Sequence, residues 1–295
     1  MAKPIFTGSG VALVTPFDRT GAVNYVKLRQ LTDWHIDQQT DAIIVCGTTG
    51  EASTLTTQEK LKTIQTVIEQ TAGRVPVIAG TGANDTALAV SLSQSAQKIG
   101  ADALLLVTPY YNKATQSGLV KHFTKIADHV NIPCILYNVP SRTAVNIHTD
   151  TYEILANHPH ITAIKEASGN LAAIQRIKQI CSDKLDIYSG NDELYLPSLS
   201  VGAIGIISVI ANILPRQSHD MYRLFTNGYI DACTKMQLEW IDLIDSLFSQ
   251  VNPIPIKTAM NLMGMDVGSC RLPLCDMDLA PLHTLKTILK KHDLI

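Results

Sequence analysis

A lysine ends a short apolar segment, residues 161–165, in which a buried strand is expected. Lysine is rare in buried strands because an unpaired ammonium group loses several kcal/mol of hydration. Side chains alternate between the two faces of a strand, so Lys165 shares a face with Ile161 and Ala163. On an inward face its pKa would fall from about 10.4 toward neutrality, and the free amine would attack carbonyl carbons. The alternative is an ordinary lysine that pairs with Glu166 or extends into solvent.

Hydroxyl groups elsewhere in the sequence could move the protons that such a reaction needs. Attack of an amine on a ketone gives a carbinolamine, which must lose water with the help of a proton donor. Tyr137 ends another apolar segment and has the same phase as Ile135. A phenol works better within a relay of hydroxyls, which Thr49 and Tyr111 could extend. The tyrosine pair 110–111 could equally consist of packing aromatics.

Two further groups could bind an anionic substrate. Backbone amides and hydroxyls of residues 47–50, among them Thr48, could bind the carboxylate of an α-keto acid. The same residues could form only a tight loop and a helix cap. Arg142 offers two parallel N–H donors for a second carboxylate, although a loop arginine is more often a solvated surface charge.

Each of these groups belongs to one of several apolar runs of strand length or follows it. The runs are residues 10–15, 42–47, 76–80, 103–107, 134–137, 161–165, 185–189 and 205–210. Near-continuous Val, Ile and Leu suits parallel strands that are covered on both faces, and segments with helical spacing separate the runs. Eight strands alternating with helices predict a (β/α)8 TIM barrel, whose active site lies at the carboxyl ends of the strands. An open doubly wound sheet is the structural alternative.

The chain continues well beyond the eighth run. Helices are expected at residues 213–227, 229–251, 254–263 and 279–290, with breaks at Pro253, Gly264, Gly268 and Pro273. We therefore predict a catalytic barrel over residues 1–228 and a C-terminal helical appendage over residues 229–295.

The composition excludes several classes of protein. Of 295 residues, 46% are hydrophobic and 17% charged, so the chain can bury a sizeable core. A formal charge of −2 gives no general attraction to nucleic acid or acidic membranes. No apolar run reaches the roughly 20 residues that span a bilayer, and residues 1–6 do not resemble a signal peptide. The expected location is the cytoplasm.

Metal and nucleotide sites are not indicated. None of the six cysteines forms a C-x-x-C pair, and the nine histidines lie mainly in predicted helices or loops rather than at strand ends. The glycine pairs at residues 8–10 and 80–82 lack the third glycine of a dinucleotide fingerprint. We expect no metal and no cofactor.

Four motifs together resemble the pyruvate-dependent Schiff-base aldolases, and among them the dihydrodipicolinate synthase family. The motifs are residues 47–51 (GTTGE), 109–111 (PYY), 137–143 (YNVPSRT) and 164–169 (IKEASG). The resemblance covers essentially the whole chain. It implies condensation of pyruvate with L-aspartate-4-semialdehyde to 4-hydroxy-tetrahydrodipicolinate, in the diaminopimelate route to lysine.

The resemblance also implies residue roles. By this match Lys165 forms the Schiff base, and Tyr137 donates and accepts protons through Thr49 and Tyr111, with Thr48 beside them. Family members are commonly homotetramers, dimers of dimers, in which the tyrosine matching Tyr111 crosses a subunit interface.

Substrate contacts follow from the same match. Thr49 and the backbone of Ile207 would contact pyruvate, and Arg142 the carboxylate of the aldehyde. Sister enzymes that cleave sialic acid or sugar keto acids share the lysine and the tyrosine, so another pyruvate lyase is the alternative activity. A non-catalytic binding homologue is the alternative of a different class.

One departure from the family concerns feedback inhibition by lysine. Inhibited members carry a histidine and a glutamate at the positions of Lys60 and Leu88, whereas Ser53, Asn84 and Tyr110 match the lysine-site pattern. Leu88 removes the natural partner of an incoming ammonium group, and Lys60 adds a like charge. We expect a vestigial effector site with weak or absent inhibition by lysine.

Overall fold

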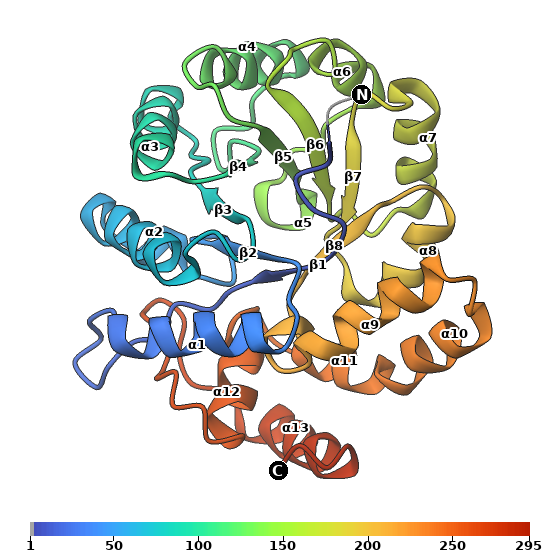
Figure 1. The fold of residues 1–295 in the computed structure, drawn as a ribbon. Coiled ribbons are helices and arrows are strands. Elements are labelled where there is room, and N and C mark those ends of the chain that lie inside the picture. Colours follow the sequence, from blue (N-terminus) through green and yellow to red (C-terminus); the bar gives the residue numbers. More distant parts are fainter. Residues whose placement is uncertain (1–2) are drawn as a thin grey trace.

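Eight parallel strands close into a barrel in the computed structural model, which describes residues 3–295 (Figure 1). Each strand pairs with the next in sequence, and β1 also pairs with β8. The predicted (β/α)8 barrel is therefore confirmed, and an open sheet is excluded. Met1 and Ala2, the start of the segment considered for a signal peptide, lie outside the described residues. The strands are β1 Gly8–Ala12, β2 Ala42–Val45, β3 Val77–Gly80, β4 Ala103–Val107, β5 Cys134–Asn138, β6 Ile161–Glu166, β7 Asp186–Ser189 and β8 Gly205–Ser208.

Helices surround the barrel and continue past it (Figure 1). Those before β8 are α1 Tyr25–Asp37, α2 Thr57–Thr71, α3 Thr86–Ile99, α4 Gln116–Ala127, α5 Pro140–Thr143, α6 Thr149–Leu155, α7 Leu171–Cys181 and α8 Tyr195–Ser200. Those after β8 are α9 Pro215–Thr226, α10 Ile230–Glu239, α11 Ile241–Leu247, α12 Ile254–Leu262 and α13 Leu279–Lys291. Short 3₁₀ turns occur at Ala52–Thr54, Asp192–Leu194 and Ile210–Asn212.

The eighth strand is shorter than the sequence predicts. It ends at Ser208 because the backbone N–H groups of Val209 and Ile210 donate to the carboxylate of Asp192, each at 3.0 Å. The Ser208 hydroxyl donates to the same carboxylate at 2.6 Å. Asp192 thus turns the chain away from the barrel directly after β8.

Apolar side chains fill the barrel interior and form a separate cluster from the layer between strands and helices. The interior cluster includes Ile44, Leu105, Ile135, Ala163 and Ile207, together with Tyr137 and Tyr188. Phe6, which precedes β1, stacks on Tyr188 at a centroid distance of 4.3 Å, and the Tyr188 hydroxyl donates to the Phe6 carbonyl.

The predicted helix over residues 229–251 is wrong in one respect, because it is two helices. The break falls at Trp240, whose ring lies 4.8 Å from that of His292. The turn allows Leu243 and Leu247 of α11 to become fully buried in the main core. Residues from α12 and α13 belong to that same core cluster, and the division at residues 228 and 229 stays a prediction. Within residues 3–295, no helix is long and apolar enough to cross a bilayer.

Candidate active site

Lys165 and Tyr137 lie side by side within the barrel. They are paired residues of β6 and β5, and the lysine Nζ lies 4.4 Å from the centroid of the phenol ring. Both residues are only 6% exposed. Glu166 faces the other side of the strand, where its carboxylate accepts from Asn138, Ser168 and Tyr152, so it does not pair with Lys165. The structure therefore supports the inward lysine over the solvated alternative.

The space around the lysine depends on a glycine. A Cβ at Gly190, which follows β7, would lie 3.0 Å from Lys165 Cε and 2.5 Å from Ala167 Cβ. The backbone N–H of Gly190 donates to the Glu166 carbonyl at 2.7 Å. The backbone thus approaches the lysine more closely than any other residue type would allow. Ile207 is fully buried in the interior cluster that also contains Tyr137.

The predicted Gly-Thr-Thr-Gly loop follows β2 and is held in a strained conformation. Both residues that flank it, Cys46 and Glu51, have positive φ, 56° and 51°. Left-handed conformations of such residues cost roughly 1–3 kcal/mol each and persist only where the surroundings enforce them. Thr49 is 2% exposed, whereas Thr48 is half-buried and lines a cavity.

A buried ion pair holds the end of this loop. Lys257 Nζ lies 2.9 Å from the Glu51 carboxylate, and it also donates to the carbonyls of Thr15 and Ser269. Burial lowers the pKa of Lys257, whereas Glu51 opposes that effect. Removing one partner of a buried pair costs about 3–5 kcal/mol because the other charge is left uncompensated. Lys257 belongs to α12, so the appendage supports the loop that carries Thr48 and Thr49.

Asn252 does not directly follow a strand, yet it connects two of the predicted site residues. The side-chain NH₂ of Asn252 donates to Thr49 Oγ1 at 3.0 Å. The backbone carbonyl of Asn252 accepts from Arg142 Nη2, also at 3.0 Å. Asn252 itself is 5% exposed. Sequence reasoning missed this residue because it searched strand ends. The only local signal was the Asn-Pro dipeptide, which marks a turn.

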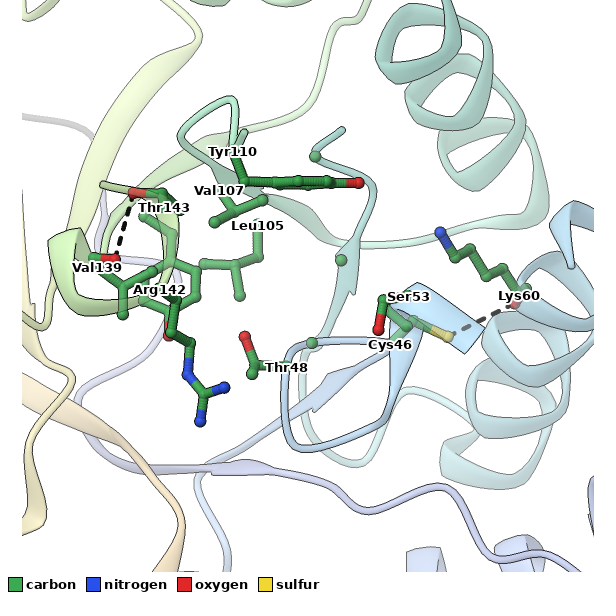
Figure 2. Close-up of a pocket in the computed structure, with 15 residues that line it drawn as sticks. Cys46, Thr48, Ser53, Lys60, Leu105, Val107, Tyr110, Val139, Arg142 and Thr143 are labelled. Carbon is green, nitrogen blue, oxygen red and sulfur yellow. Dashed lines mark hydrogen bonds between the residues drawn. The ribbon is translucent and has the colours of Figure 1, made fainter. Parts of the chain in front are cut away.

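A cavity of about 290 Å³ opens among the carboxyl ends of β2 to β5 (Figure 2). In Figure 2, Thr48 and Arg142 lie at one side, Tyr110 lies above them, and Ser53 and Lys60 lie at the far side. Tyr137 contributes to the lining, which holds two cationic side chains and no acidic one. Such a cavity favours small anions.

Cys46 is the only thiol in the lining of this cavity within the described residues. Burial raises the pKa of the Cys46 thiol to about 12. It therefore remains protonated at neutral pH and does not compete with the lysine as a nucleophile.

Tyr111 is not brought to the other site residues. It has a φ of 75° and is 90% exposed, whereas Tyr110 is 38% exposed and lines the cavity. Within one chain, the Tyr111 side chain therefore lies in solvent, whereas Tyr137 and Thr49 are buried.

The predicted effector residues are divided between the cavity and the surface. Ser53, Lys60 and Tyr110 line the cavity, whereas Asn84 and Leu88 do not. Leu88 is 40% exposed, and the Asn84 carbonyl accepts from Asn112. Burial lowers the pKa of Lys60, which has no acidic side chain within 4.0 Å among residues 3–295. Lys60 thus carries the same positive charge as a lysine effector, and no carboxylate beside it could bind the effector's ammonium group.

Metal ligands do not gather at this site. In the described part of the chain, no three His, Cys, Asp or Glu side chains form a group that could hold a metal ion. What the site offers is an amine, a phenol, hydroxyls and a guanidinium. These groups suit reactions of carbonyl compounds that also carry carboxylates.

Comparisons with known proteins agree along the whole length of the chain. Residues 5–292 match the model of the Dihydrodipicolinate synthetase family. The chain is 53% identical to the 4-hydroxy-tetrahydrodipicolinate synthase of Clostridium novyi (strain NT), over 98% of this chain and 97% of that one.

Solved structures show the same relationship. The dihydrodipicolinate synthase from Aquifex aeolicus superposes with a TM-score of 0.95 at 43% identity, covering 98% of this chain and 99% of that one. The chloride-inhibited dihydrodipicolinate synthase from Acinetobacter baumannii, complexed with pyruvate, gives a TM-score of 0.96 at 41% identity, covering 98% and 99%.

Proposed function

The chain belongs to the dihydrodipicolinate synthetase family, and from this premise we propose that it is a 4-hydroxy-tetrahydrodipicolinate synthase. It condenses pyruvate with L-aspartate-4-semialdehyde in the diaminopimelate route to lysine. The observation that carries this proposal is the buried Lys165 amine, which lies 4.4 Å from the centroid of the Tyr137 ring. Tyr137 in turn lines a cavity whose lining contains no acidic side chain.

Lys165 is the nucleophile of the first step. Its Nζ attacks C2 of pyruvate, and the carbinolamine loses water to give an imine. Loss of a proton from C3 then gives an enamine, whose C3 attacks the aldehyde carbon of the second substrate. The amino group of that substrate finally attacks C2, closes the ring and releases Lys165.

Proton transfers in these steps fall to the two buried hydroxyl groups. Tyr137 stands beside the amine, where it protonates the departing hydroxyl of the carbinolamine and the aldehyde oxygen. Thr49, fixed by Asn252, continues the relay, and the hydroxyl and amides around Thr48 bind the pyruvate carboxylate. The backbone of Ile207 lines the pyruvate side.

The second substrate brings a carboxylate and an amino group. Arg142 provides a bidentate partner for the carboxylate, and its bond to the Asn252 carbonyl fixes the guanidinium. Asn252 Oδ1 is buried and has no hydrogen-bond partner among residues 3–295. We assign it as the acceptor for the substrate amino group.

Tyr111 enters the relay only from a second copy of the chain. A side chain that is 90% exposed on a left-handed turn is suited to a subunit contact rather than to its own barrel. We therefore propose a homotetramer, a dimer of dimers, in the cytoplasm. In such an assembly Tyr111→Phe would lower turnover without changing the sedimentation coefficient, whereas a monomer with full activity would contradict the assignment.

Turnover measurements separate this function from its alternatives. Purified protein should consume pyruvate only when aspartate semialdehyde is added, and should not cleave sialic acid or sugar keto acids. Cleavage of those compounds at a comparable rate would favour a sister lyase. Absence of turnover with every substrate would favour a binding homologue.

A further inference from the structure

Directly after Tyr137 on β5 and Lys165 on β6, each strand carries a buried polar residue. Asn138 follows Tyr137, Glu166 follows Lys165, and the two pairs are in register across the strands. Asn138 is 1% exposed and Glu166 2%. Both face the layer between strands and helices, where the preceding outward residue of β6 is the apolar Ile164. We call this pair the Asn138–Glu166 clamp.

The Glu166 carboxylate is held by hydrogen bonds from neutral groups. Asn138 Nδ2 donates to Asn146 Oδ1 at 2.8 Å and shares its other hydrogen between the two Glu166 oxygens, at 3.1 and 3.0 Å. Ser168 N donates to Oε1 at 2.9 Å, and the Tyr152 hydroxyl donates to Oε2 at 3.2 Å. No cationic side chain of residues 3–295 lies within 4.0 Å of it. Burial and the Glu166 charge raise the pKa of Tyr152 well above its usual value, so its hydroxyl remains a donor. A carboxylate buried without a counter-ion requires all these donors.

The same pair ties together the segments that follow three strands. The side-chain Oδ1 of Asn138 accepts from the backbone N–H of Ile147. The backbone carbonyl of Asn138 accepts from the N–H of Ala167 at 2.9 Å. The Glu166 carbonyl accepts from Gly190, the residue that packs against Lys165. A displacement of the clamp would therefore move the ends of β5, β6 and β7 relative to one another.

We propose that Asn138 and Glu166 are positioning residues, which hold Tyr137 and Lys165 in the geometry that the reaction needs. This inference rests on the proposed function. An apolar pair would fill the same space without burying a charge, but it would not fix the register and rotation of two strand ends. A misplacement of about 1 Å between reacting groups can lower a rate about 100-fold. Hydrogen bonds between the residues that follow each reacting group restrict that displacement.

The variant Glu166→Gln tests the clamp. It keeps the size of the side chain but turns an NH₂ group toward at least one of the donors. We expect kcat, and the rate constant for borohydride-trapped imine at saturating pyruvate, to fall about 10- to 100-fold, with KM for pyruvate changed only a few-fold. The matched control is Ile164→Val on the same outer face, which should lower thermal stability but leave kcat unchanged.

The exchanged pair Asn138→Asp with Glu166→Gln restores one amide-to-carboxylate hydrogen bond in the opposite direction. The exchanged pair should react at least about five-fold faster than Glu166→Gln alone. A general loss of stability in the single variant would not explain such a recovery. A single variant with kcat within about two-fold of the wild type, or an exchanged pair as slow as the single variant, would overturn the proposal.

A milder change keeps the test decisive if Glu166→Gln does not fold. Tyr152→Phe removes one donor from Glu166, and a three- to ten-fold fall in the trapping rate, about 0.6–1.4 kcal/mol, would support the clamp. An unchanged rate would refute it. If the wild-type protein itself traps no pyruvate, the proposed function fails, whereas equal trapping by wild type and variants refutes the clamp alone.

Discussion

Asn252→Ala is the variant that most directly separates the appendage's part in the site from its part in stability. The side chain donates a 3.0 Å hydrogen bond to Thr49 Oγ1 in a buried setting, whereas the bond from Arg142 goes to the Asn252 backbone and survives the change. Losing a partner for a buried polar group costs about 1–3 kcal/mol. Since about 1.4 kcal/mol corresponds to a factor of ten, we expect kcat to fall by about ten-fold and at most about 100-fold.

Kinetics of the variants give the assay. KM for the aldehyde should rise as well, because the change removes Asn252 Oδ1, which we assign to the substrate amino group, whereas KM for pyruvate should change little. A double-mutant cycle with Thr49→Val should give a coupling energy of about 0.5–3 kcal/mol, since both changes remove the same hydrogen bond. Asn261→Ala is the matched control. It removes two hydrogen bonds from another part of the appendage, one donated to the Gly268 carbonyl and one accepted from the Val267 N–H, and should leave kcat unchanged.

Two results would refute this reasoning. One is a kcat for Asn252→Ala within about two-fold of the wild type, and the other is strict additivity with Thr49→Val. Either would mean that Thr49 does not depend on Asn252 for its position.

Three further changes test other parts of the site and its support. Gly190→Ala should lower the free energy of unfolding by about 1–3 kcal/mol and kcat at least about ten-fold, because the new Cβ would lie 3.0 Å from Lys165 Cε. Urea titration measures the first effect and initial rates the second. A fully active variant would contradict the contact. Arg271 lowers the pKa of Glu59 from 4.5 to about 2, so their pair stabilises the protein fully above about pH 4.5 and progressively less as the pH falls toward 2. Glu59→Gln should therefore cost about 1–2 kcal/mol at pH 7 and less below pH 4.5 in urea titrations, and a pH-independent difference would exclude this linkage. Because Lys60 repels an incoming ammonium group, sub-millimolar lysine should leave the initial rate unchanged, and strong inhibition there would disprove the vestigial site.

Residues at strand ends were predictable because the hydrophobic pattern locates the strands and parallel strands bring their carboxyl ends together. Strand alternation predicted that Lys165 shares a face with Ala163, and Tyr137 with Ile135, while their roles followed from the family resemblance. The structure places Lys165 and Tyr137 as register partners. Arg142 and Thr48 followed from their distance beyond a strand, and both line the cavity. Local periodicity was thus enough to locate most of the predicted site residues.

Long-range contacts limited the rest. Asn252 follows no strand, and its relation to Thr49 joins residues 203 positions apart in sequence. The length of β8 depends on Asp192, 16 to 18 residues earlier, which accepts the amides that would have continued the ladder. Tyr111 faces solvent in a single chain, so no pattern within one sequence places it against another side chain. The clamp escaped notice because Glu166 was considered only as a partner of Lys165.

The central claim is that the amine of Lys165 forms a covalent imine with pyruvate. Mass spectrometry after treatment with pyruvate and borohydride tests it directly. The wild-type chain should gain the mass of one pyruvic acid less one oxygen atom, on the peptide that contains Lys165, and Lys165→Ala should gain nothing. An unmodified wild-type chain, or an adduct on another lysine, would contradict the account.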